Sequence, residues 1–133
     1  MKTLRVIASL DHLDAVVQFT EHQAEELGLD PGKASRISLV LEEAFVNICS
    51  YAYPGNTGHA DIRCGRDNNF FMLEIGDEGA PFNVLSLPEP DTTLGIEERE
   101  IGGLGVHFIR KLPDRVDYRR ENNCNLLRMF FAL

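Results

Sequence analysis

The sequence predicts one α+β domain, a two-layer sandwich in which a mixed, mostly antiparallel sheet is covered by helices on one face. The 133 residues are enough for one domain with its own core, so we expect a single unit spanning residues 1–133. The elements are predicted in the order strand, helix, helix, two strands, long loop, helix, two strands. Because the strands come in neighbouring pairs, a sheet of hairpins is favoured over a doubly wound one.

A strand and a helix are predicted first. Residues 3–9, TLRVIAS, alternate between apolar and more polar positions, as a half-buried strand does. Ser9 or Asp11 can cap the helix that follows, and Gly28 can end it. The apolar positions of that helix recur at helical spacing and are Leu13, Val16, Val17, Thr20, Ala24 and Leu27.

The clearest helical pattern follows in DPGKASRISLVLEEAFVNICSYAY. Asp30 offers an N-cap, and Pro31 suits the first helical position. One apolar stripe is predicted to face the core, formed by Ile37, Leu41, Ala44, Ile48 and Tyr51. Proline and glycine at residues 54–58 end the helix.

The second half of the chain contains two further pairs of strands. HADIRCGRD and FFMLEIGDEG are predicted to form a hairpin around the turn at residues 67–69. Residues 80–103 are rich in Pro, Gly, Thr and acidic residues without a steady period, which predicts a long loop or lid. LGVHFIRKL returns to helical spacing, and residues 116–119 and 125–133 are predicted to be the closing strands.

Composition and charge exclude several classes of protein. Hydrophobic residues make up 44% and charged residues 26%, so wholesale disorder is not expected. A formal net charge of -8 disfavours a general nucleic-acid binder, which needs clustered Lys and Arg. We therefore expect a protein partner and no direct contact with nucleic acid.

Cysteine usage and hydropathy indicate a cytoplasmic protein. Cys49, Cys64 and Cys124 lie far apart, without a CxxC motif or the spacing of metal ligands, and are predicted to be reduced, mostly buried thiols. The first residues contain no apolar block long enough for a signal peptide, and no later run reaches transmembrane length. We expect no membrane association.

The first candidate site is the pair Glu43 and Asn47 on the second predicted helix. Their i, i+4 spacing places them about 40° apart around the helix, so both side chains can reach one small site. Asn supplies a neutral oxygen that suits Mg²⁺, and Glu can orient or deprotonate a nucleophile. On spacing alone, a surface Glu and Asn beside the core stripe is the simpler explanation.

The second candidate is IGDEGAPF, at residues 75–82. Asp77 ends a strand pattern, and Gly79 and Pro81 change the chain direction immediately after it. A carboxylate there can accept a hydrogen bond from an exocyclic amine, while the bare glycine backbone lets a flat ring approach. A turn in which Asp77 only accepts from local N–H groups explains the motif equally well.

The third candidate is GGLGVHFIRKL, where Gly102, Gly103 and Gly105 precede and open a helix. Free N–H groups and the positive end of the helix dipole can hold phosphate oxygens. The motif lacks the strand-first context of a dinucleotide fingerprint and the Lys of a P-loop. Glycines kept for flexibility and tight packing are the open alternative.

In chain order, the three clusters are ExxxN on a helix, DxGxPF after a strand, and GGLG at a helix start behind a variable lid. This set resembles the GHKL superfamily of ATP-binding domains, and it is most similar to the anti-sigma factor serine/threonine kinase branch (RsbW-like). The resemblance covers nearly the whole chain and rests on LEEAFVNICSYAYP, IGDEGAPFN and GGLGVHFIRKLPDRVDYRR. It implies the helix-on-sheet sandwich of that superfamily, with an ATP lid, which agrees with the predicted element order.

The resemblance also implies roles for the residues of the first two clusters. Glu43 would be the catalytic general base, and Asn47 would be the Mg²⁺ ligand and contact the nucleotide. Asp77 would bind the amino group of adenine, with Gly79 making room for the ring. For the first pair, these roles match those that the side-chain chemistry allows.

The third cluster would bind the phosphates, with Gly103 and Gly105 presenting backbone N–H groups. The other nucleotide-binding positions that the resemblance implies are Pro81, Phe82, Gly102, Leu104 and Val106. The chain also departs from the family pattern. Pro81 replaces a glycine of the broad superfamily, Asn83 stands where Asp is frequent, and residues 80–102 contain no Lys and only Arg99 as a basic residue.

The function that this resemblance implies is an ATP- and Mg²⁺-dependent protein serine/threonine kinase. In the family, the substrate is a small anti-sigma factor antagonist, and the kinase alternately sequesters a sigma factor. A nucleotide-dependent protein-binding module with little or no phosphotransfer is the alternative, motivated by the missing lid Lys and by Asn83. The family kinase is a homodimer, so residues 4–24 are a candidate interface, although core packing explains that segment equally well.

Overall fold

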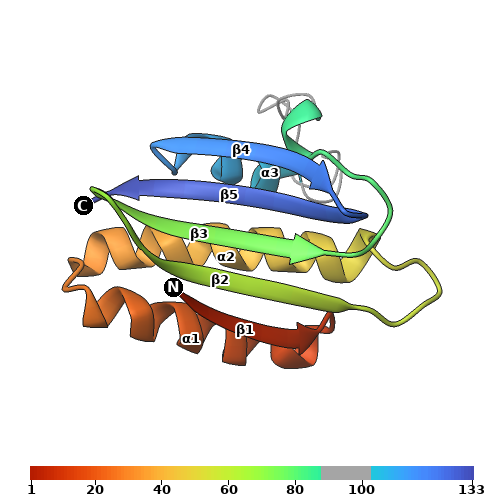
Figure 1. Ribbon diagram of the computed structural model, residues 1–133, viewed down its shortest axis with the longest axis horizontal. Coiled ribbons are helices and arrows are strands. Elements are labelled where there is room, and N and C mark those ends of the chain that lie inside the picture. The colour runs from red at the N-terminus through yellow and green to blue at the C-terminus, as the bar shows by residue number, and fades with distance from the viewer. Residues whose placement is uncertain (88–102) are drawn as a thin grey trace.

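The structure, a computed structural model, describes residues 1–87 and 103–133. Its elements follow the predicted order (Figure 1). They are β1 (Lys2–Ile7), α1 (Leu13–Glu26), α2 (Pro31–Tyr51), β2 (His59–Asp67), β3 (Phe70–Asp77), α3 (Gly103–Lys111), β4 (Arg115–Glu121) and β5 (Cys124–Ala132), with short 3₁₀ turns η1 (Leu10–His12) and η2 (Val84–Ser86). Most of the predicted lid lies outside the described residues.

The five strands form one sheet in the order β1-β2-β3-β5-β4. Each neighbouring pair is antiparallel, so within the described ranges the sheet is wholly antiparallel rather than mixed. Two-residue turns close both hairpins, and Asn68 (φ 54°), Asn122 (φ 52°) and Asn123 (φ 62°) adopt the left-handed conformation that Asn tolerates. The helices cover one face of this sheet, as Figure 1 shows.

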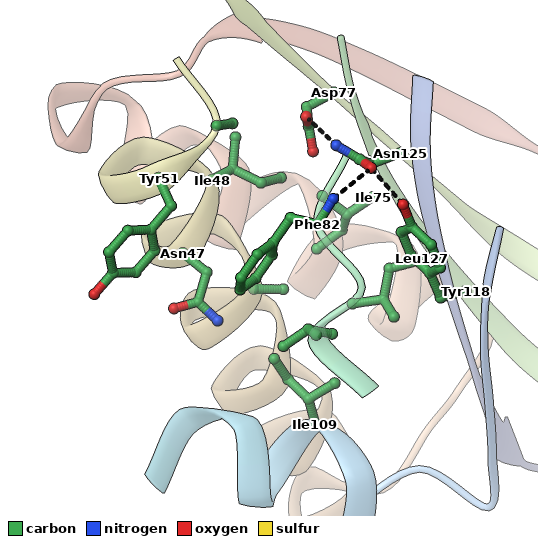
Figure 2. A pocket seen from close by; sticks show the side chains of 13 residues that line it. Asn47, Ile48, Tyr51, Ile75, Asp77, Phe82, Ile109, Tyr118, Asn125 and Leu127 are labelled. Atoms are coloured by element: carbon green, nitrogen blue, oxygen red, sulfur yellow. Dashed lines mark hydrogen bonds between the residues drawn. The ribbon is translucent and has the colours of Figure 1, made fainter. Parts of the chain in front are cut away.

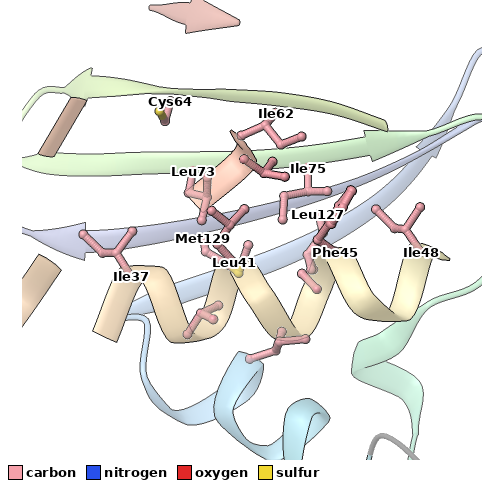
Figure 3. Close-up of a cluster of buried hydrophobic side chains, with 14 of the residues drawn as sticks. Ile37, Leu41, Phe45, Ile48, Ile62, Cys64, Leu73, Ile75, Leu127 and Met129 are labelled. Carbon is pink, nitrogen blue, oxygen red and sulfur yellow. The ribbon is translucent and has the colours of Figure 1, made fainter. Parts of the chain in front are cut away.

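The main core lies between α2 and the central strands. Ile37, Leu41, Ala44 and Ile48 of the predicted stripe are buried, as expected. Figure 3 shows this side of α2 against the sheet. The facing side chains on the strands are Ile62, Leu73, Ile75, Leu127 and Met129.

Two apolar positions of the helical patterns, of which only Tyr51 was predicted to face the core, are exposed, and both lie at helix ends. Tyr51 is 43% exposed, because the last turn of α2 carries it to the side where it stacks on Phe82. Leu27 is 37% exposed, because it follows the last turn of α1. Gly28, with φ 71°, ends that helix as predicted.

The predicted caps are partly confirmed. The Asp30 side chain accepts a hydrogen bond from Lys33 N at 2.9 Å and caps α2. Ser9 accepts from Asp11 N at 3.3 Å, but it caps η1 rather than α1. Helix α1 begins at Leu13 without a side-chain cap, because the 3₁₀ turn already leads the chain into it.

The sheet face opposite the helices is covered by its own long side chains. Met72 and Phe130 pair across β3 and β5 on this face, and both are buried. The Arg115 guanidinium lies 4.7 Å from the centroid of the Phe130 ring, and Arg128 Nε donates to Glu74 Oε2 at 2.7 Å. Arginine stems thus shield apolar side chains while their charges stay paired or in water.

Tyr53 fastens the loop after α2 to the end of β3. Its hydroxyl donates to His59 O at 2.6 Å and accepts from Glu78 N at 2.7 Å. The ring lies so close to Gly58 that a Cβ at that position would be 2.1 Å from Tyr53 Cε1. These two hydrogen bonds of the Tyr53 hydroxyl, called the Tyr53 latch below, fix the backbone next to Asp77. This is the end of the sheet where a pocket opens.

Two further sequence expectations can be compared with the described residues. Cys49, Cys64 and Cys124 are free thiols, and Cys64 is buried, with burial raising the pKa of its thiol to about 12. Cys49 and Cys124 are only partly buried. Among the described helices, none is long and apolar enough to cross a membrane.

We predict that Gly58→Ala lowers the free energy of unfolding by about 1–3 kcal/mol, as overpacking does elsewhere, because two hydrogen bonds hold the Tyr53 ring in the way. Urea denaturation measures the change. Gly32→Ala is the matched control, since its Cβ would meet only Asp30 Oδ1, at 3.3 Å. Equal stability of the two variants would contradict the latch.

Candidate functional site

A pocket of about 480 Å³, including the solvent at its mouth, lies between the C-terminal half of α2, α3 and the adjoining ends of β3 and β5 (Figure 2). Its apolar wall is formed by Ile48, Ile75, Val84, Ile109 and Leu127. The polar side chains at its edge belong to Asn47, Asp77, Tyr118 and Asn125. A mostly apolar cavity with a few placed polar groups is typical of a small-molecule site.

Asp77 is the buried carboxylate of the pocket, with 8% of its surface exposed. Its Oδ1 accepts hydrogen bonds from Gly79 N at 2.8 Å and from Asn125 Nδ2 at 2.9 Å. Among the described residues, no donor reaches its Oδ2. Because a buried acceptor without a partner is costly, Oδ2 is suited to accept a hydrogen bond from a ligand amine.

Asn125, at the start of β5, holds this end of the pocket together, and the sequence analysis missed it. Its Nδ2 donates to Asp77 Oδ1 and to Ala80 O, both at 2.9 Å. Its Oδ1 accepts from Phe82 N at 3.2 Å and from the Tyr118 hydroxyl at 2.6 Å. The amide therefore fixes the carboxylate and the following loop together. The one signal in the sequence is an Asn at the head of the apolar run NLLRMFFAL.

The turn after β3 is held from two sides, by the end of α2 and by Arg120 on β4. Gly79 packs against the end of α2, where a Cβ would lie 2.3 Å from Ala52 O. Ala80 N donates to that same oxygen at 3.2 Å, and Arg120 Nη1 donates to Gly79 O at 2.7 Å. This contact gives Gly79 a packing reason besides the predicted approach of a ring, which stays a prediction. Gly79 is not among the residues that line the pocket.

An aromatic pair forms the rim of the pocket. The rings of Tyr51 and Phe82 stack with their centroids 6.2 Å apart and an interplanar angle of 28°. Asn47, one helical turn before Tyr51, lies beside Phe82 in Figure 2, and its amide has no hydrogen-bond partner among the described residues. Pro81 is exposed and lies outside the lining, and Asn83 caps η2 by accepting from Leu85 N at 2.9 Å.

Glu43 lies one turn before Asn47 but not in the pocket lining. Its carboxylate meets the first turn of α3, where a Cβ on Gly105 would lie 2.3 Å from Glu43 Oε2. Partial burial raises the pKa of Glu43, and the neighbouring charge of Glu42 raises it further. A half-buried carboxyl group with a raised pKa is suited to receive a proton.

The third predicted cluster falls partly outside the described residues. Gly102 is not described, whereas α3 begins at Gly103 and continues through Leu104, Gly105 and Val106. Gly105 admits the Glu43 carboxylate, and Val106 is buried in the core rather than placed in the pocket lining. Arg110 on the same helix donates to the carbonyl oxygens of Leu85 and Leu87, which connects α3 to η2.

The pocket thus brings Asn47, Asp77 and Phe82 together, and the contact between α2 and α3 places Glu43 next to Gly105. Within residues 1–87 and 103–133, no group of three His, Cys, Asp or Glu side chains could hold a metal ion. A metal here would have few protein ligands. The candidate is the side-chain amide of Asn47, which lines the pocket and has no hydrogen-bond partner among the described residues.

Comparison with known proteins gives one family and two relatives. The family model described as "Histidine kinase-like ATPase domain" matches residues 6–131. Serine/threonine-protein kinase BtrW from Bordetella bronchiseptica is 25% identical over 92 residues, which cover 68% of this chain and 65% of that protein. The histidine kinase AdeS of Acinetobacter baumannii has a similar fold, with a TM-score of 0.55 and 16% identity over 99% of this chain and 68% of that one.

We predict that Asn125→Leu lowers the free energy of unfolding by about 3 kcal/mol, because it leaves several buried polar groups without partners. Tyr118→Phe removes one of these hydrogen bonds and should cost about 1 kcal/mol. Urea denaturation of both variants measures the difference. If the two lose the same stability, Asn125 does not organise the pocket.

We also predict that Glu43→Gln raises the melting temperature at neutral pH. A carboxyl group whose pKa is higher in the folded than in the unfolded protein stabilises the fold only while it is protonated. Its contribution is complete below the unfolded pKa, near 4.5, and is lost as the pH rises through the folded pKa. The advantage of Gln should therefore vanish in acid below pH 4.5 and grow above it. Thermal melts across this range measure it, with exposed Glu121→Gln as control. An advantage independent of pH would contradict the burial effect.

Proposed function

The chain belongs to the family of histidine kinase-like ATPase domains, and on that premise we propose that it is an ATP- and Mg²⁺-dependent protein serine/threonine kinase. We further propose that its substrate is a small anti-sigma factor antagonist in a partner-switching pathway. The observation that carries the proposal is the edge of α2 beside the pocket. Glu43, Asn47 and Tyr51 follow one another there at intervals of one helical turn.

The pocket fits the base of ATP. Oδ2 of Asp77, which no donor reaches within residues 1–87 and 103–133, can accept a hydrogen bond from the exocyclic amine of adenine, and the aliphatic wall can pack against a flat ring. The phosphates would then extend past Asn47 towards the first turn of α3. Backbone N–H groups and the helix dipole favour anions there.

Asn47 fits a Mg²⁺ ion carried by the nucleotide. Mg²⁺ commonly takes one or two protein ligands and fills its remaining positions with phosphate oxygens and water. An unpartnered amide oxygen with no cluster of carboxylates nearby agrees with that donor set in the described residues. When bound, the ion would offset the charge that develops on the transferred phosphoryl group.

Glu43 is the proposed general base. The hydroxyl oxygen of the substrate serine attacks the γ-phosphorus, the bond from that phosphorus to the bridging oxygen breaks, and ADP leaves. The proton of the hydroxyl passes to the Glu43 carboxylate. Partial burial, which raises the pKa of this group, strengthens its hold on that proton.

The choice of serine or threonine as acceptor is supported by the motifs of the sequence and by the relative BtrW, whose name is that of a serine/threonine-protein kinase. The chain spans 65% of the length of that relative. The proposed partners, an antagonist protein and a sigma factor, follow from the sequence resemblance. A second copy would pair through β1, the edge strand of the sheet within residues 4–24.

We predict that the protein transfers labelled γ-phosphate from ATP to candidate antagonist proteins of its source organism, and that Glu43→Gln reduces the rate by about 10²–10⁴-fold, the usual contribution of a general base. Electrophoresis of the labelled products measures transfer. Calorimetry should find ATP affinity in the presence of Mg²⁺ within about threefold of the parent, because Glu43 lies outside the pocket lining.

ATP binding without any phosphoprotein would contradict the kinase and favour the nucleotide-dependent binding module. A thermal shift with ATP and Mg²⁺ keeps the two questions separate, because a ligand that binds only the folded state raises its melting temperature. No shift at millimolar ATP would contradict the nucleotide site itself.

A further inference from the structure

A second hollow lies away from the pocket, in the outer surface of the helical layer. It is a groove of about 1070 Å³, including the solvent at its mouth, between α1 and α2. Its apolar floor is formed by Val17, Leu29, Ala34 and Leu39, all partly buried. The groove follows α1 for about two helical turns, or roughly 12 Å.

The charged side chains that line this groove are all acidic. Glu21 and Glu25 come from α1, and Glu42 comes from the facing side of α2. None of the three has an ion-pair partner within the described residues. Of the other described glutamates outside the proposed ATP site, Glu74, Glu78 and Glu121 pair with arginines. Glu26 lies 3.1 Å from His22 Nε2.

The position of these charges is unfavourable for the isolated chain. Glu21 and Glu25 are four residues apart on one helix, where like charges destabilise it. Glu42 adds a third negative charge across the groove, and its neighbour Glu43 already has a pKa raised in part by it. A cation supplied from outside would relieve this repulsion.

We propose that the groove between α1 and α2 is a docking surface for a basic amphipathic helix of a partner protein. Apolar side chains of that helix would pack on the floor, while Lys or Arg side chains on its flanks would pair with the three carboxylates. Nucleic acid and anionic membranes would be repelled by the acidic rim. This surface is separate from the pocket, so binding there requires neither ATP nor the proposed phosphotransfer.

A second copy of the chain is a poorer occupant. The basic residues of its edge strand β4 are already engaged, since Arg115 pairs with Asp117 and Arg119 pairs with Glu121. Arg120 donates to Gly79 O. A partner with uncommitted cationic side chains therefore fits the groove better.

The test uses the full chain and a fluorescent 18-residue helical peptide with a leucine face flanked by lysines. The variant Glu21→Gln/Glu25→Gln/Glu42→Gln should weaken binding about tenfold or more, as measured by fluorescence anisotropy. The matched control Glu26→Gln/Glu78→Gln/Glu121→Gln removes the same number of charges elsewhere and should change the Kd less than about twofold. Equal losses in the two variants would overturn the proposal, because they would indicate only general attraction.

A second variant separates a groove from a purely electrostatic surface. Leu39→Ala keeps all three carboxylates and should still weaken the peptide about three- to tenfold, because it removes part of the floor. Thermal melts confirm that each variant is folded. An unchanged Kd for Leu39→Ala, or dimerisation by light scattering that the triple Gln variant abolishes, would overturn the proposal, the latter in favour of a second copy.

Discussion

Helix α2 packs along the middle of the sheet, and this contact determines where everything else lies. Ile37, Leu41 and Ile48 bury one side of the helix against β3 and β5. Because that side is fixed, the neighbouring edge of the same helix must present Asn47 to the pocket and Glu43 to α3. Core packing and the arrangement of the site are therefore two results of one helical periodicity.

Close backbone approaches give the site its shape. Gly105 lets α3 come within reach of the Glu43 carboxylate, and Gly79 lets the turn after β3 press against Ala52. Asn125 then fixes the Asp77 carboxylate by one oxygen, and no donor within the described part of the chain reaches the other. An aliphatic wall with one oriented acceptor can distinguish a ring that carries an amine from one that carries a carbonyl, because the latter offers no donor.

Much of the fold could be predicted from the sequence, because the apolar periods and the caps are local. Asn47 and Asp77, which the sequence motifs singled out, line the pocket, although spacing alone explained them as well by a surface amide and a local turn; their roles toward a nucleotide stay predictions. Asn125 could not, because Asp77, Ala80 and Phe82 lie more than 40 residues away along the chain and meet it only when β3 pairs with β5. Tyr51 was misplaced for a related reason: helical spacing does not indicate where the sheet stops covering a helix.

The antiparallel order of the strands also separates the two ends of the sheet. Asp77 and Asn125 lie at one end, where they pair across β3 and β5, whereas the turn at Asn68 and Asn69 joins the opposite ends of β2 and β3. Because that turn is short and polar, it is a suitable place to insert a tag or a fluorophore. A reporter there would stand a full strand length from the pocket, so it could follow the protein in cells without touching the chemistry.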